Sequence, residues 1–206
     1  MRFTILLTMA AILVTGTSRA QETSPVAPNP VPAVETPVVD QATGLAAWQD
    51  IYEVFAHPRC ANCHVEDDHP RWSGPHYGAP RIHAFNVMRG VDGSGFGNPG
   101  LRCTTCHFAS NSNVLYGPPG APAWHLAPVE MAWFGKSSAA ICAQIKDPER
   151  NGGRTIAEVA EHVRDDALVA WGWTPGPGRE PAPGSAEETF AAIERWDAAG
   201  APCPID

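Results

Sequence analysis

The sequence has no apolar run of the length that a membrane-spanning helix needs, which is about 20 residues. Its most apolar stretch, Phe3 to Val14, is shorter than that. It also has no surplus of basic residues, because 14 Lys and Arg stand against 22 Asp and Glu. Nucleic-acid binding depends on a basic surface and is therefore disfavoured. We expect a mature protein with no membrane span and no nucleic-acid partner.

Residues 1–20 have the features of a secretory signal peptide. Arg2 precedes the apolar stretch, and Ser18 and Ala20 place small residues where a signal peptidase cleaves. No cysteine stands directly after Ala20, so a lipid anchor is not expected. Cleavage after Ala20 would leave 12 basic and 22 acidic residues, a formal charge of −10. The expected location is the periplasm, where an acidic protein can be steered to a basic patch on a redox partner.

Only six cysteines occur, and four of them lie in two Cys-x-x-Cys-His pentapeptides. This pattern is the attachment signature of a c-type haem. Two thiols bond to one porphyrin and the adjacent imidazole becomes the proximal iron ligand. A redox dithiol would not need the histidine twice, and exported chains are seldom zinc-ribbon proteins. The sequence therefore predicts two covalently attached haem c groups, with thioether residues Cys60, Cys63, Cys103 and Cys106 and proximal ligands His64 and His107.

The composition divides the chain into a signal peptide (1–20), a Pro-rich flexible linker (21–43) and a di-haem domain (44–206). Haem unit one covers about 44–100, and haem unit two with the C-terminal helices covers about 101–206. The expected fold is mostly α with long Pro/Gly-rich loops around the two haems, without a convincing strand pattern. Apolar periodicity and capping signals predict helices over 45–56, from Ser137 or Ser138 to Asp147, from Thr155, and from Ser185 to Gly200.

The two haem segments share a longer pattern than the pentapeptide. Each reads Arg-Cys-x-x-Cys-His, then a loop, then Gly-Ala-Pro-x-apolar-His. Such an internal repeat predicts two equivalent haem-binding units. A low-spin haem needs a second axial ligand, His or Met. The repeated histidines are the favoured distal candidates, each for the haem of its own unit, and the alternatives are two methionines and a helical histidine: His83 and His125, then Met88, Met131 and His162.

Two cysteines, Cys142 and Cys203, belong to neither motif. In an oxidising compartment two such thiols usually pair, so we predict a disulfide that pins the C-terminus to the domain. Arg59, Arg102 and Arg179 are candidates for pairing with haem propionates, because a guanidinium matches carboxylate geometry.

Several segments from residue 45 to 206 resemble bacterial di-haem cytochromes that are loosely labelled isoquinoline 1-oxidoreductase subunit-like. The resemblance lies in His57-Pro58-Arg59-Cys60 to His64, in Trp124 to Pro128, in Asn151 to Thr155, and in Trp171 to Trp173 with Gly178 to Pro181. It implies a cytochrome role, and it implies electron transfer from a molybdenum hydroxylase.

The expected function is that of a di-haem electron carrier between a redox protein donor and an acceptor, not of an enzyme. A small di-haem peroxidase is the alternative, and it would require one iron with an open sixth position. The other alternative is the cytochrome subunit of a larger, molybdenum hydroxylase-type dehydrogenase.

Overall fold

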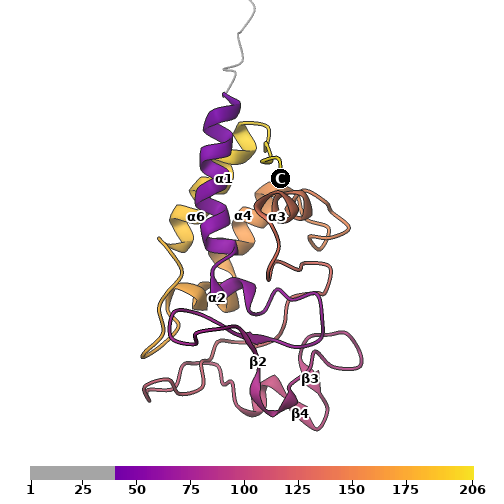
Figure 1. The fold of residues 1–206 in the computed structure, drawn as a ribbon, viewed down its shortest axis with the longest axis vertical. Coiled ribbons are helices and arrows are strands. Elements are labelled where there is room, and N and C mark those ends of the chain that lie inside the picture. Colours follow the sequence, from indigo (N-terminus) through magenta and orange to yellow (C-terminus); the bar gives the residue numbers. More distant parts are fainter. Residues whose placement is uncertain (1–39) are drawn as a thin grey trace, which may run out of the picture. The chain divides into compact units, whose positions relative to one another are not determined.

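A computed structural model describes residues 40–206. The helices gather at one end of this part of the chain and the long loops and short strands at the other, with α2 between them (Figure 1). Six α-helices and three short 3-10 helices follow in order within it: α1 Gln41–Phe55, α2 Pro58–Ala61, η1 Ala84–Asn86, η2 Cys103–Thr105, α3 Ser138–Ile145, α4 Ile156–Asp165, α5 Ala167–Ala170, η3 Trp171–Trp173 and α6 Ala186–Ala198.

The first helix begins four residues earlier than its apolar periodicity predicts. Asp40 caps it by accepting a hydrogen bond from the backbone N–H of Ala42 at 3.3 Å. Residues 41–43 therefore belong to α1, and the predicted linker boundary at residue 43 is wrong by three residues. The apolar face of α1 is buried as expected, with Trp48 and Ile51 each 1 % exposed.

The three predicted C-terminal helices are confirmed. Ser137 caps α3, and Thr155 and Glu158 form the expected capping box at the start of α4. Ser185 caps α6 by accepting from the backbone N–H of Glu188. Helix α6 packs against both α1 and α4, and the Trp48 and Trp196 rings meet at 4.9 Å in the core.

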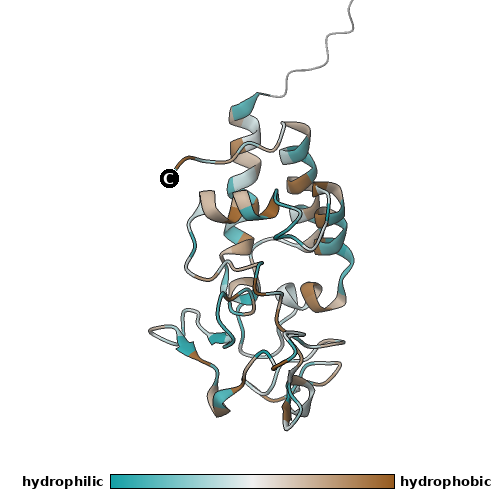
Figure 2. Cartoon of the chain, turned by 90° about the vertical axis from the view of Figure 1, so that its right-hand side faces the viewer, coloured by the Kyte–Doolittle hydropathy of each residue, from teal (hydrophilic) through white to brown (hydrophobic). Residues whose placement is uncertain are grey.

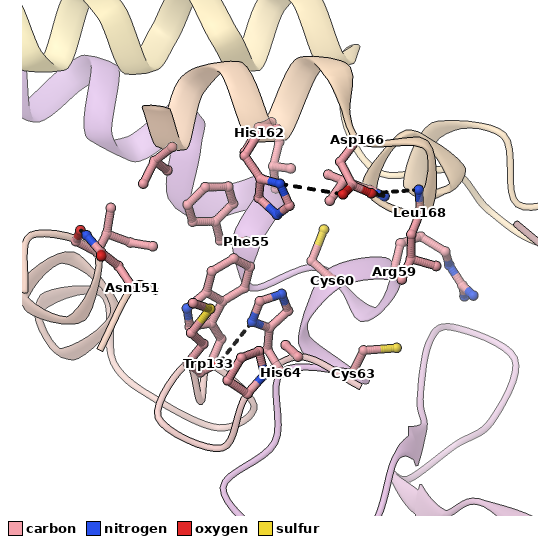
Figure 3. Close-up of a pocket in the computed structure, with 18 of the residues that line it drawn as sticks. Phe55, Arg59, Cys60, Cys63, His64, Trp133, Asn151, His162, Asp166 and Leu168 are labelled. Carbon is pink, nitrogen blue, oxygen red and sulfur yellow. Dashed lines mark hydrogen bonds and ion pairs between the residues drawn. The ribbon is translucent and has the colours of Figure 1, made fainter. Parts of the chain in front are cut away.

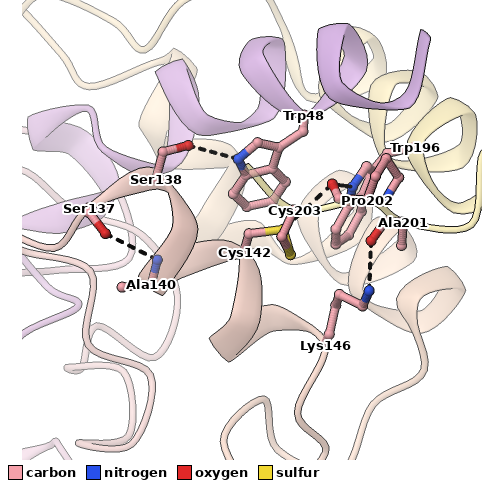
Figure 4. Close-up of a disulfide and its surroundings, with 10 residues drawn as sticks. All are labelled: Trp48, Ser137, Ser138, Ala140, Cys142, Lys146, Trp196, Ala201, Pro202 and Cys203. Atoms are coloured by element: carbon pink, nitrogen blue, oxygen red, sulfur yellow. Dashed lines mark hydrogen bonds between the residues drawn. A yellow bond between two sulfur atoms is a disulfide. The ribbon is translucent and has the colours of Figure 1, made fainter. Parts of the chain in front are cut away.

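The predicted disulfide between Cys142 and Cys203 is confirmed (Figure 4). It joins α3 to the C-terminal segment, which two further hydrogen bonds hold. Trp196 Nε1 donates to the Pro202 carbonyl at 2.9 Å, and Lys146 Nζ donates to the Ala201 carbonyl at 2.7 Å. The last residues of the chain are thus fixed to the helical end.

The loop end contains four two-residue strands that the sequence pattern did not predict. They form two antiparallel hairpins, β1 Arg71–Trp72 with β2 Arg81–Ile82 and β3 Gly97–Asn98 with β4 Leu101–Arg102. Strands this short have no alternation that could be recognised. Figure 2 shows hydrophobic segments alternating with hydrophilic ones along this end, where several large apolar side chains are exposed: Ile82, Phe85, Val91, Phe108, Val114 and Leu115.

No helix within residues 40–206 has the length and apolar character to cross a membrane. The predicted signal peptide and nearly all of the predicted linker lie outside the described residues.

Candidate functional site

The first pentapeptide lies on the short helix α2 and the turn that follows it. His57 caps this helix, because its Nδ1 accepts a hydrogen bond from the backbone N–H of Arg59 at 3.2 Å. Pro58 occupies the first helical position, where its fixed φ suits a helix and its missing N–H costs nothing. The His64 N–H then bonds to the Cys60 carbonyl at 3.3 Å, so Cys60 and His64 lie one helical turn apart.

The His64 ring is held on two sides. Its Nδ1 hydrogen-bonds with the Met131 carbonyl at 2.8 Å, which leaves Nε2 as the free ring nitrogen. The ring also stacks on Trp133 at 3.5 Å between centroids, and Trp133 in turn stacks on Phe55 of α1 at 4.4 Å. The buried Trp133 Nε1 donates to Gln144 Oε1 of α3 at 2.5 Å. Segments far apart in the sequence therefore fix the direction of one imidazole.

A cavity of about 270 Å³ lies beside this ring. Cys60, Cys63 and His64 line it from below, and His162 of α4 faces it from the opposite wall (Figure 3). Asp166 lies one turn after His162 on the chain, and its Oδ2 is 3.6 Å from His162 Nδ1. Because Nδ1 faces this carboxylate, His162 has its Nε2 available to a group in the cavity. Other apolar lining comes from α1, α3 and α4: Val54, Phe55, Ile145, Val159 and Val163.

Burial keeps the two thiols and the imidazole of the first motif neutral at pH 7. It raises the pKa of Cys60 to about 12, and the nearby Cys63 thiol raises it further. It also raises the pKa of Cys63 to about 11. Burial lowers the pKa of His64 to about 4, although the hydrogen bond to the Met131 carbonyl acts in the opposite direction. A redox dithiol needs a lowered thiol pKa, so the first Cys pair does not have the properties of one.

The second pentapeptide forms the same kind of turn, but a β-hairpin rather than a helix leads into it. The β3–β4 hairpin leads into η2, and the Cys103 N–H bonds back to the Phe96 carbonyl at 3.1 Å. The His107 N–H bonds to the Cys103 carbonyl at 3.0 Å, as in the first motif. His107 Nδ1 hydrogen-bonds with the Pro119 carbonyl at 2.8 Å, and its ring stacks on Trp124 at 4.6 Å. His107 is therefore held as His64 is, by a carbonyl and a tryptophan.

The loop that supplies the Pro119 carbonyl is closely packed. A Cβ on Gly120 would collide with the backbone carbonyls of Phe108 and Ser110, so this position requires glycine. Asn111 accepts hydrogen bonds from the Gly120 N–H at 3.0 Å and from Trp171 Nε1 at 2.9 Å. Asn111 thereby ties this loop to η3. Nothing in the sequence pattern marked Asn111.

The structure does not contain the two equivalent units that the repeat predicts. Gly78, the counterpart of Gly120, has φ +67° and open space around it. His107 takes its carbonyl partner from its own unit, whereas His64 takes its partner from Met131 in unit two. Residues 40–206 all belong to one compact body. The two motifs share their immediate geometry, but the protein around them is not duplicated.

The distal candidates lie in places that the repeat did not suggest. The His83 ring lies 6.0 Å from that of His107, not beside His64. His125 lines the cavity of the first motif and stacks on Phe96 at 4.7 Å. Met131 also lines that cavity, while Met88 does not. His162, which the sequence offered only as an alternative, occupies the cavity wall opposite His64.

Arg59 tests whether this cavity suits a group with carboxylates. Its side chain lines the cavity, and its buried Nε has no hydrogen-bond partner among residues 40–206. Its guanidinium lies 5.8 Å from the Trp171 ring centroid, and burial followed by the charge of Arg179 lowers its pKa. A buried guanidinium nitrogen without an acceptor is costly unless an anionic partner binds it. A haem propionate is such a partner, so Arg59 fits the group that the pentapeptides imply.

One further residue that holds the site could not have been chosen from the sequence pattern. Arg89 is 3 % exposed and donates to the carbonyls of Val65, Asp67 and Ala127. It joins the chain after the first motif to the segment that carries His125 and Met131. Asp166, by contrast, had a usable signal, because it follows the helical His162 at a spacing of four residues.

No protein-family model, no curated protein and no solved structure matches this chain.

Proposed function

We propose that this protein is an exported di-haem c-type cytochrome that carries electrons between redox partners. One observation carries the proposal. Both Cys-x-x-Cys-His motifs fold into the same helical turn, and each histidine has Nδ1 on a backbone carbonyl at 2.8 Å and its ring on a tryptophan. Each ring is thus held in one tautomer with Nε2 free, which is the arrangement that a metal-ligating histidine adopts.

The residues that would hold the two haems follow from the motifs. Cys60 and Cys63 would form the thioethers of the first and Cys103 and Cys106 those of the second, with His64 and His107 as proximal ligands. A bound haem supplies one-electron chemistry at its iron. The chain supplies orientation, exclusion of water and charge, and these set the reduction potential.

At the first site, the opposite cavity wall would supply the sixth ligand. His162 faces the cavity across from His64, and Asp166 orients its ring by a contact with Nδ1. His125 and Met131 also line this cavity. The Met131 carbonyl accepts from Nδ1 of His64, so its backbone lies at the ring edge opposite the free Nε2. His162 is therefore better placed than Met131.

A carrier whose two irons each have a sixth ligand from the protein needs no substrate site. In this proposal the partners are a redox protein donor and an acceptor, of which a dehydrogenase is one. The acidic composition would direct the protein to basic surfaces on those partners. The proposed location is the periplasm, where covalent haem attachment takes place.

Haem counting tests the proposal. The chain is produced by export in a bacterium that attaches c-type haem, and the purified protein is analysed by intact mass and by the pyridine haemochrome spectrum. We expect two haems that remain after denaturation and organic extraction, and one haem in the Cys60→Ala/Cys63→Ala and Cys103→Ala/Cys106→Ala variants. A redox titration should show two one-electron steps. Absence of covalent haem would overturn the proposal, and rapid peroxide turnover would favour the peroxidase.

A further inference from the structure

We infer that His83 is the second axial ligand of the haem held by His107, so that the loop after the first motif completes the second haem. The inference rests on the proposed function. It reverses the pairing that the internal repeat suggests, in which His83 would serve the first haem and His125 the second.

The spacing of the two rings carries the inference. The His83 and His107 centroids are 6.0 Å apart, with 63° between the ring planes. Metal–imidazole bonds are about 2 Å long, so a metal held between two Nε2 atoms would place the centroids roughly 6 Å apart. A direct hydrogen bond between the two nitrogens would bring the centroids closer, to roughly 5 Å. The observed spacing therefore leaves room for one atom between the rings.

Both rings have the nitrogen that such a pair requires. His107 Nδ1 bonds to the Pro119 carbonyl at 2.8 Å, and His83 Nδ1 bonds to the Ala84 carbonyl at 2.9 Å. Nε2 is the remaining nitrogen in each case. A carbonyl at Nδ1 fixes the tautomer in which Nε2 has its lone pair available to a metal.

The position of His83 is built into the fold. His83 directly follows β2, and its N–H bonds to the Pro70 carbonyl at 2.9 Å, which extends the β1–β2 hairpin. Its ring packs on Trp72 of β1 at 4.9 Å. A hairpin that fixes both the backbone and the ring gives His83 the rigidity that an axial ligand needs.

Exposed apolar residues flank both histidines in the sequence. Ile82 precedes His83 and is 53 % exposed, and Phe108 follows His107 and is 69 % exposed. Phe85, two residues after His83, is 82 % exposed. These segments thus expose apolar side chains that a bound porphyrin could cover.

Spectroscopy of the holoprotein tests the pairing. In His83→Ala we expect two haems still attached by mass, with one of the two converted from low-spin to high-spin in EPR and optical spectra, and restored to low-spin by added imidazole. His76→Ala is the matched control, because His76 is exposed and lies in the turn between β1 and β2. It should leave both haems low-spin.

Single-haem variants identify which haem responds. In Cys60→Ala/Cys63→Ala, which keeps only the second haem, adding His83→Ala should give a high-spin spectrum. In Cys103→Ala/Cys106→Ala, which keeps only the first, it should change nothing. If His125→Ala and not His83→Ala alters the second haem, or if His83→Ala alters the first, the inference is overturned while the proposed function stands. If no haem is attached, the proposed function itself fails.

Discussion

The disulfide Cys142–Cys203 should account for a large part of the stability of this protein. It closes a segment with a sequence separation of 61 residues, which contains α4, α5, η3 and α6. A cross-link restricts the unfolded chain, and the loop-entropy relation gives about 4 kcal/mol for a loop of this length. Cys142 is fully buried, and the partly buried Cys203 packs against the core. We therefore expect Cys142→Ala/Cys203→Ala to lower the free energy of unfolding by about 4 kcal/mol.

Urea unfolding followed by tryptophan fluorescence measures this loss. With a slope of about 2 kcal/mol per molar urea, the midpoint should fall by about 2 M. The reduced wild-type chain is the matched control, because it lacks the cross-link but keeps the sulfur volume, and it should lose nearly as much. A loss below about 1 kcal/mol in both proteins would refute the argument from loop closure. A large loss in the variant alone would assign the effect to packing at Cys142.

Three further predictions concern the site and its supports. Gln144→Leu leaves the buried Trp133 Nε1 without an acceptor and the Arg150 carbonyl without its Gln144 donor. It should destabilise the protein by about 1–3 kcal/mol in urea unfolding, with the exposed Gln49→Leu as the control. Arg59→Gln removes a positive charge that favours the reduced iron, so one haem reduction potential should fall by roughly tens of millivolts in a redox titration. The exposed Arg81→Gln is the control, and an unchanged potential in Arg59→Gln would contradict the pairing of Arg59 with a propionate. The Arg71 hydrogen bond lowers the pKa of Asp67, so its contribution to stability is present above about pH 4 and lost as the pH falls below that; unfolding free energies measured from pH 5 to pH 2 should decline less steeply in Asp67→Asn.

Features that depend on neighbouring residues in the sequence were predictable. The capping box at Thr155, the apolar faces of the helices and the helical turn of the first motif are all local, and all appear in the structure. The disulfide was predictable because only two cysteines lay outside the motifs.

Features that depend on the path of the loops were not predictable. Strands of two residues leave no periodic signal, yet the β1–β2 hairpin decides where His83 lies. The burial of Arg89 was not predictable either, because arginines are usually exposed. Its partners are backbone carbonyls, which any residue type provides, so the sequence does not mark them. The repeat showed that histidines recur at a fixed spacing, but a spacing along the chain does not say to which motif a loop returns.

The hydrogen bond between His64 and the Met131 carbonyl also bears on the order in which the two motifs are enclosed during synthesis. Its carbonyl partner lies 67 residues later in the chain, and the facing His162 lies later still, whereas the partner of His107 is only 12 residues away. A chain made from its N-terminus presents Cys60 to His64 before the cavity walls from α3 and α4 exist. The second motif can close on its own loop at once. The motif that is synthesised first is therefore the last to be enclosed. In the proposed di-haem protein, its cysteines would stay accessible for haem attachment until the C-terminal helices are synthesised.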